Sequence, residues 1–236
     1  MSVKPKTAAS LIALLFLAFL PTHAQDRNTD ASKSGPFTKG LDHLFNYLNM
    51  AGTEKAAQFK PVTQPERNRL YLQSMVNPFT FVKAGFSAGL DHWNNKPTEW
   101  HQGAAAYGQR FANILGQYAV QKTATYSLSS LLHEDNRYFN SGKHGLWPRV
   151  GYALSSGILA RHDDGSRHVS ISQIGGAAAG AFIARAWLPP SQSSAGDGAV
   201  SFGITMASNA GFGIVKEFLP DLGRKLSKKD KLPATK

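Results

Sequence analysis

Small residues recur at every fourth position in four stretches of this sequence, and this spacing constrains the fold more than any other feature. Residues four apart share one face of an α-helix. The four stretches contain Gly85 and Gly89; Gly108, Ala112 and Gly116; Gly176, Gly180 and Ala184; and Gly203, Ala207 and Gly211. A Gly inside a helix costs roughly 0.5–1 kcal/mol relative to Ala, but a strip of small residues lets two backbones approach closely. The pattern therefore predicts helices that touch along seams with almost no side chains.

The fold class that we predict is mainly α, a compact bundle of about five Gly/Ala-lined helices. Prolines and polar capping residues mark the ends of these helices. The expected helices span residues 78–93, 98–138, 148–159, 172–187 and 199–219. One small β-hairpin is expected near residues 160–170, because Asp164-Gly165 is a strong turn signal.

Length and composition exclude several classes of protein. A chain of 236 residues fits one domain with tails. The absence of cysteine excludes disulfide scaffolds, thiolate nucleophiles and Cys-ligated metal sites. The formal charge is +11, but the residues from Asp221 onwards contribute +4 of it. The positive charge therefore does not form a basic face across the fold, and we expect no nucleic-acid partner.

The amino terminus has the layout of a cleaved secretory signal at residues 1–24. Lys4 and Lys6 precede an unbroken apolar run at 11–20, and Pro21 then leads to small residues that end at Ala24. The run is too short to span a bilayer, which takes about 20 residues, although a retained anchor is the alternative reading. We therefore expect export to the periplasm or cell envelope.

The rest of the chain divides into three parts. Residues 25–67 form a polar leader with a short amphipathic helix at 41–50. Residues 68–222 form the helical domain, and residues 223–236 form a basic tail. Such a tail is attracted to an anionic membrane surface, and the alternative is a solvated, solubilising end.

Two charge-free windows, 168–184 and 198–215, leave the relation to a membrane open. Both are of marginal length for a span and are diluted by Ser, Thr, Asn, Gln and Gly. A compact soluble bundle, a peripheral or partly inserted protein, and spanning helices are all compatible with these windows.

The densest polar cluster contains His133, Glu134, Asp135 and Arg137. These four residues are candidate catalytic residues, because a His beside carboxylates can act as an acid–base pair or hold a metal. The alternative is a helix C-terminus whose polar groups are all hydrogen-bonded. The zincin spacing is absent, since no second His lies four residues on.

Glu99 and His101 are further candidate catalytic residues, since they open the expected long helix close to Asp91 and His92. Asp91, His92, His101 and His133 together have donor atoms that suit a metal. Their spacing is not diagnostic of a metal site, however, so we predict no metal and no cofactor.

Several motifs together resemble an exported bacterial protein family of the Acidobacteria type. They are Glu99-Trp100-x-Gln102-Gly103 with Tyr107-Gly108-x-Arg110, the stretch 131–139 (LLHEDNRYF), Arg149-x-Gly151-Tyr152-Ala153, and Lys216-Glu217-Phe218-x-Pro220-Asp221. The resemblance covers roughly residues 68–224 and implies export and a single domain. No activity is assigned to that family, so the resemblance implies no catalytic residue. This chain departs from the family pattern at Asn136, where a Pro is usual, and near Ala186-Trp187, where an aromatic pair is usual.

The function that we predict is that of an exported cell-envelope protein with a non-catalytic, structural or membrane-associated role. The signal, the small-residue faces and the basic tail favour it. The alternative is an envelope hydrolase or metal-binding enzyme that uses the cluster around His133, Glu134 and Asp135. The oligomeric state and any substrate are not indicated by the sequence.

Overall fold

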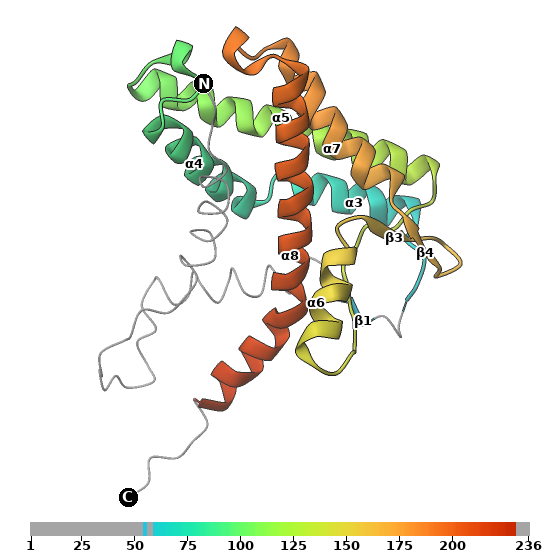
Figure 1. Ribbon diagram of the computed structural model, residues 1–236. Helices are drawn as coiled ribbons and strands as arrows, with labels where there is room; N and C mark the ends of the chain where they lie inside the picture. Colours follow the sequence, from blue (N-terminus) through green and yellow to red (C-terminus); the bar gives the residue numbers. More distant parts are fainter. Residues whose placement is uncertain (1–53, 56–58, 230–236) are drawn as a thin grey trace, which may run out of the picture. The chain divides into compact units, whose positions relative to one another are not determined.

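The computed structural model describes residues 54–55 and 59–229, with side chains described for 59–221, and all of them belong to one compact unit, His43–Lys236. The predicted signal peptide, the short helix at 41–50 and the end of the basic tail lie outside the described residues. Within them the chain is mainly helical and has a small antiparallel hairpin, as predicted (Figure 1).

The first two helices of the described part are α3 (Gln64–Met75) and α4 (Pro78–Trp93). The range of α4 agrees with the prediction, and the side chain of Asn77 caps it by accepting a hydrogen bond from the Phe79 amide. Helix α3 was not predicted, because Pro65 suggested a connector. Pro65 instead lies in the first turn of α3, where a missing amide proton costs nothing.

The long helix α5 (Ala104–Leu131) is shorter than the predicted 98–138 at both ends. The 3-10 helix η2 (Thr98–Trp100) precedes it as a separate turn. The chain then passes through positive φ angles at His101 and Gly103, which no α-helix contains. At the other end, α5 stops at a cap made by the residues from Leu132 to Glu134.

One short helix and two small two-stranded sheets make up the next part of the fold. Helix α6 (Leu146–Ser155) leads into the hairpin of β3 (Leu159–Arg161) and β4 (Arg167–Val169), which closes around the predicted Asp164-Gly165 turn. Strands β1 (Glu54–Lys55) and β2 (Phe139–Asn140) pair in parallel and were not predicted.

Helix α7 (Ile171–Ile183) begins directly after the hairpin and continues into the 3-10 helix η3 (Ala184–Ala186). A further 3-10 turn, η4 (Pro190–Gln192), leads to the last helix, α8 (Ala195–Lys229).

Helix α8 does not end at Pro220, where the sequence predicted a stop. A Pro inside a helix removes one backbone hydrogen bond and usually bends or ends it. Here the Arg149 side chain bonds Glu217 on one side of Pro220 and Asp221 on the other. This double ion pair supports the helix across the break, so the first residues of the predicted tail belong to α8.

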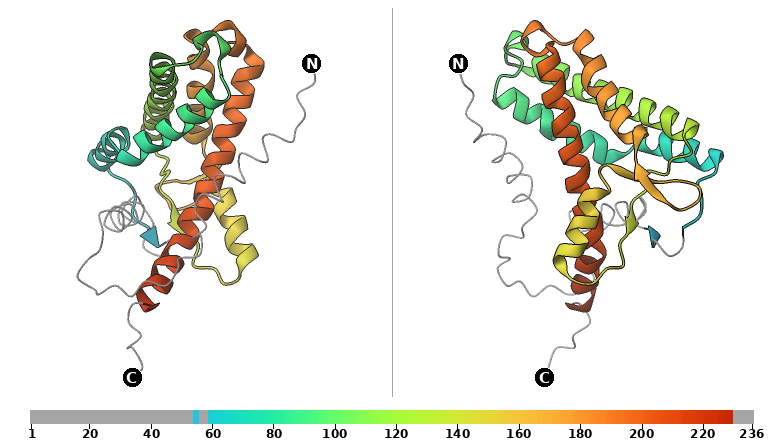
Figure 2. Two further views of the ribbon diagram at one scale, coloured as in Figure 1. Left: turned by 90° about the vertical axis from the view of Figure 1, so that its left-hand side faces the viewer. Right: turned by 45° about the vertical axis from the view of Figure 1, so that its right-hand side comes forward.

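The closest helix contact joins α5 and α7, which lie side by side in each view (Figures 1 and 2). A Cβ added at Gly176 would lie 1.9 Å from Thr125 Oγ1 and 2.9 Å from the carbonyl oxygen of Gln121. A Cβ added at Gly180 would lie 2.8 Å from Gln121 Cβ and 3.0 Å from the carbonyl oxygen of Gln117. Two backbones therefore approach along this seam as predicted, and only glycine fits there.

The seam on α8 exists, but the sequence placed it on the wrong face of the helix. The predicted strip of Gly203, Ala207 and Gly211 does not form the contact: a Cβ at either glycine would meet no described atom within 4 Å. The contact with α6 instead involves Gly213, whose added Cβ would lie 2.5 Å from the Ala153 carbonyl oxygen. A Cβ added at Gly157 would likewise lie 3.0 Å from Ala210 on α8.

Other predicted seam residues also face open space. An added Cβ at Gly89 or Gly108 would meet no described atom within 4 Å, and Gly116 makes only an ordinary contact with Trp187. The four-residue spacing of Gly and Ala thus identifies helices that have a face without large side chains. The tertiary packing decides which of those faces contacts another helix.

The described core consists mostly of alanine. Eight alanines are almost fully buried: Ala84, Ala88, Ala106, Ala153, Ala160, Ala177, Ala181 and Ala184. Many large apolar side chains are exposed instead, from Leu72 on α3 to Val200 and Ile204 on α8. Small residues therefore form the helix contacts, and many larger apolar side chains face outwards.

Candidate functional site

The predicted cluster at residues 133–137 lies at the C-terminal end of α5, and each of its members has a structural partner. His133 adopts a positive φ of 54° immediately after the C-cap residue Leu132. The amide of Glu134 then donates to the carbonyl oxygen of Ser129 at 3.0 Å. This six-to-one hydrogen bond around a left-handed residue is a Schellman cap. The His133 side chain is 69% exposed and lies 3.3 Å from Asp163, Nδ1 to Oδ2.

Glu134 turns away from His133 and anchors the start of α7. Its carboxylate accepts hydrogen bonds from the amides of Ile171 and Ser172, both at 2.9 Å, and from the hydroxyls of Ser170 and Ser172. Burial of this carboxylate, which is 1% exposed, tends to raise its pKa, but the hydrogen bonds outweigh burial and lower the pKa. Glu134 is therefore an anion held at a helix N-terminus, where the helix dipole favours it.

Asp135 and Arg137 form a second, separate pair. The Arg137 guanidinium donates to both carboxylate oxygens of Asp135, at 2.8–3.1 Å, and also bonds Glu66 on α3. Arg67 on α3 donates to the carbonyl oxygen of Glu134. These contacts attach α3 to the end of α5, which is the structural role that the sequence left open as an alternative.

Glu99 and His101 lie at the opposite end of α5. A helix of 28 residues is roughly 40 Å long, so the two predicted groups of catalytic residues do not meet. Glu99 is exposed and accepts hydrogen bonds from the amide and hydroxyl of Ser191 in η4. The backbone oxygen of His101 accepts a hydrogen bond from the buried Arg110, whose guanidinium also bonds the carbonyl oxygens of Lys96 and Pro97.

The four residues considered as metal ligands are separated in the same way. His133 is at the far end of α5 from His101, and Nδ1 of His92 is 3.1 Å from an Arg110 nitrogen. Among residues 59–221 no three His, Asp or Glu side chains gather closely enough to hold a metal.

A buried carboxylate that the sequence did not single out connects α8 to the loop before α6. Glu217 accepts hydrogen bonds from the hydroxyl of Tyr138 at 2.7 Å, the amide and hydroxyl of Ser141, and Arg149 at 2.9 Å. Burial tends to raise the pKa of Glu217, but the bonds from Ser141, Tyr138 and Arg149 lower it. Two motifs of the family resemblance, around Arg149 and around Glu217, therefore meet in space.

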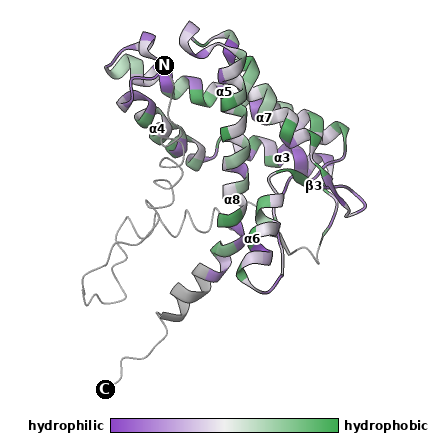
Figure 3. Cartoon of the chain, viewed as in Figure 1, coloured by the Kyte–Doolittle hydropathy of each residue, from purple (hydrophilic) through white to green (hydrophobic). Residues whose placement is uncertain are grey.

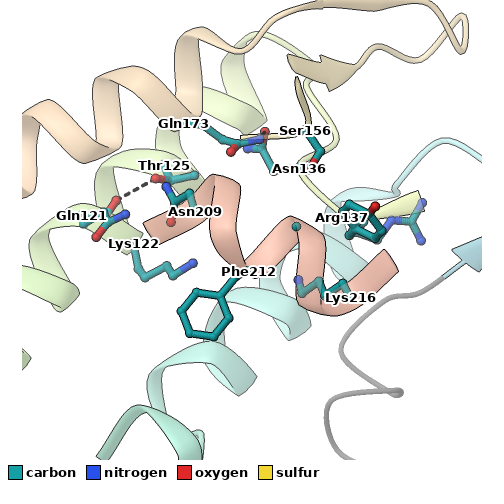
Figure 4. A pocket seen from close by; sticks show the side chains of 12 residues that line it. Gln121, Lys122, Thr125, Asn136, Arg137, Ser156, Gln173, Asn209, Phe212 and Lys216 are labelled. Carbon is teal, nitrogen blue, oxygen red and sulfur yellow. Dashed lines mark hydrogen bonds between the residues drawn. The ribbon is translucent and has the colours of Figure 1, made fainter. Parts of the chain in front are cut away.

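A polar pocket with a volume of about 150 Å³ lies between α5, α7 and α8. Figure 4 shows Lys122 from α5 and Lys216 from α8 extending into it beside the ring of Phe212. Its other polar lining residues are Gln121, Thr125, Asn136, Arg137, Tyr138, Ser156, Gln173 and Asn209. The described side chains that line it include no Asp or Glu.

The two lysines that line this cavity have lowered pKa values. Burial, and after it the nearby positive charge of Lys122, lowers the pKa of Lys216 to about 8. Burial also lowers the pKa of Lys122. Lys83 on α4 has a lowered pKa, first through burial and then through Lys122, and its Nζ lies 5.1 Å from the centre of the Phe212 ring. The cavity thus gathers positive charge.

The sequence analysis missed this cavity, although one signal was available. Lys122 and Arg110 are the only charged residues of α5, a helix with no Asp or Glu. A Lys in a helix that has so few charged residues and no acidic one is a candidate for a buried, functional cation. Its partner Lys216 is 94 positions away, and no local pattern connects the two.

Comparison of the chain with models of known protein families, with curated proteins and with solved structures finds no significant match. The resemblance drawn from the motifs therefore stays a prediction. The function has to be argued from the structure alone.

Proposed function

We propose that this chain is an exported cell-envelope protein with a non-catalytic role, which associates with a membrane surface through α8. The observation that carries the proposal is an exposed apolar stripe on that helix. The stripe consists of Val200, Gly203, Ile204, Ala207 and Val215. These residues follow spacings of three, four and eight, so they lie on one side of the helix.

The stripe is large and free of charge. Val200 is 64% exposed and Ile204 is 62% exposed, and no charged residue occurs between Asp197 and Lys216 (Figure 3). Among the described residues, α8 is the helix that is long and apolar enough to cross a membrane, and only 11% of its apolar window is buried. Apolar surface of this extent on one helix marks an interaction site.

The opposite side of α8 favours a helix that lies along the membrane over one that spans it. That side packs against α6 and α7 and contains Lys216 and Glu217. Spanning would place the Glu217–Arg149 ion pair and the polar cavity at bilayer depth, which is costly. A helix with one apolar and one polar side instead lies in the interface with its apolar side towards the lipid.

Charge complementarity favours an anionic lipid surface as the partner. Helix α8 continues without interruption into positions 224, 225, 228 and 229, all of which are Arg or Lys. Basic residues next to an apolar helix add about 1 kcal/mol each at an anionic surface. The apolar stripe and the basic end then act on the same membrane.

Vesicle flotation tests the proposal with a matched pair of variants. Leu72 on α3 and Ile204 on α8 are both 62% exposed, so Leu72→Glu and Ile204→Glu introduce the same charge at equal exposure. We expect the wild type and Leu72→Glu to float with phosphatidylglycerol vesicles and Ile204→Glu to stay in solution. Equal flotation of all three proteins, or no flotation of the wild type, would contradict the proposal.

We do not propose the alternative function, that of an envelope hydrolase. Its candidate residues are divided between the two ends of α5, and the carboxylates of Glu134 and Asp135 are occupied by structural partners.

A further inference from the structure

We propose that the cavity between α5, α7 and α8 binds a phosphate group, held by Lys122 and Lys216. This inference is independent of the apolar stripe, because it depends on the opposite side of α8. Asn209 lies about 140° around the helix from Ile204, and Lys216 about 120°.

The first argument is uncompensated charge. Among the described residues, neither Lys122 nor Lys216 forms an ion pair or a hydrogen bond; the only described partner of the Lys122 ammonium is the Tyr118 ring, 5.5 Å from its centre. Arg137 also lines the cavity, but its charge is matched by Asp135. Two partly buried ammonium groups that repel each other are unfavourable, and an anion bound between them relieves the repulsion.

The second argument is the supply of neutral donors. The side-chain amides of Gln121 and Asn209 line the cavity and make no hydrogen bond to the described protein groups. Asn136 and Gln173 bond each other at 3.1 Å and complete one wall. Amide donors beside lysines can bind the several oxygens of a phosphate, with each lysine acting as a point charge.

The third argument is size. A volume of about 150 Å³ corresponds to about five water molecules at roughly 30 Å³ each. It accommodates a phosphate group with some water. The phosphate group can belong to free phosphate or to the head of a phospholipid, and the experiment distinguishes the two.

Isothermal titration of the purified chain with inorganic phosphate, at constant ionic strength, tests the proposal. We expect saturable binding that chloride does not reproduce. The double variant Lys122→Met/Lys216→Met should weaken binding at least tenfold, whereas Lys143→Met, at an exposed lysine outside the cavity, should leave it unchanged. Circular dichroism checks that the double variant is folded. No saturable binding, or equal affinity in the double variant, would overturn the proposal.

A second measurement keeps the test valid if the double variant does not fold. The phosphorus NMR line of inorganic phosphate should broaden with the wild type and with Ile204→Glu but not with the single variant Lys216→Gln. Broadening that persists in Lys216→Gln would also overturn the proposal.

Titration with dihexanoyl phosphatidic acid below its micelle concentration identifies the source. Affinity at least tenfold above that of inorganic phosphate, lost in the lysine variants, assigns the cavity to a lipid headgroup. Equal or lower affinity assigns it to free phosphate. Since Ile204→Glu leaves the cavity intact, failure of membrane association and failure of phosphate binding are separate results.

Discussion

Replacing Gly176 by Ala tests the closest helix contact in the molecule. A methyl group there would lie 1.9 Å from Thr125 Oγ1 and 2.9 Å from the Gln121 carbonyl oxygen. The Thr125 hydroxyl donates to that same carbonyl at 2.8 Å, so rotating it away sacrifices a hydrogen bond. The backbone carbonyl cannot rotate, and α7 has to move away from α5.

The expected magnitude follows from three contributions. Overpacking costs typically 1–3 kcal/mol, and the lost hydrogen bond costs about 1 kcal/mol. The higher helix propensity of Ala returns up to about 1 kcal/mol. We therefore expect a net loss of about 2 kcal/mol in the free energy of unfolding. In a chain of this length that lowers Tm by about 4–8 °C.

Gly203→Ala is the matched control for this substitution. Gly203 is also inside a helix, but an added methyl group meets no described atom within 4 Å. Here only the propensity gain remains, so the variant should be about 0.5–1 kcal/mol more stable than the wild type. Urea denaturation without lipid measures both changes. A Gly176→Ala protein as stable as the wild type would refute the close approach of α5 and α7.

Three further substitutions test the polar groups. Glu134→Gln should cost about 2–4 kcal/mol in urea denaturation at pH 7, because four donors lose their anionic acceptor. Since folding lowers the pKa of Glu134, this stabilisation is present above the unfolded pKa near 4.5 and is lost as the pH falls. The variant should therefore lose less stability than the wild type between pH 5 and 2. Lys216 has a folded-state pKa of about 8 against 10.5 unfolded, so the unfolded chain binds more protons between these values and stability rises with pH there. Lys216→Met should be more stable at pH 7, on the order of 1–3 kcal/mol. In a pH series of melting curves it should show a smaller rise than the wild type, because Lys122 and Lys83 keep their lowered pKa values. A rise equal to that of the wild type would contradict the assignment. His133→Gly should gain about 0.5–1 kcal/mol in thermal melts, because Gly adopts the positive φ of the cap without strain, and a loss would indicate that the imidazole contact with Asp163 matters more.

The candidate site was predictable only in part. The sequence correctly marked residues 133–137 as the densest polar cluster and left its role open. Glu134 became a structural anchor because α7, which begins 37 positions later, presents its N-terminal amides to the carboxylate. Whether a buried carboxylate is reactive depends on donors from distant segments, and no local spacing contains that information.

The sequence by itself determined the mainly helical class, the range of α4 and the turn at Asp164-Gly165. It could do so because caps, prolines and turn residues act on their immediate neighbours. It also identified the flat seam at Gly176 and Gly180. Only the tertiary structure decided that Gly203 and Gly211 face outwards while Gly213 packs, and that Lys122 and Lys216 meet in one cavity. The physical reason is that helical periodicity fixes which residues share a face, whereas the direction of that face depends on helices that are far away in the sequence.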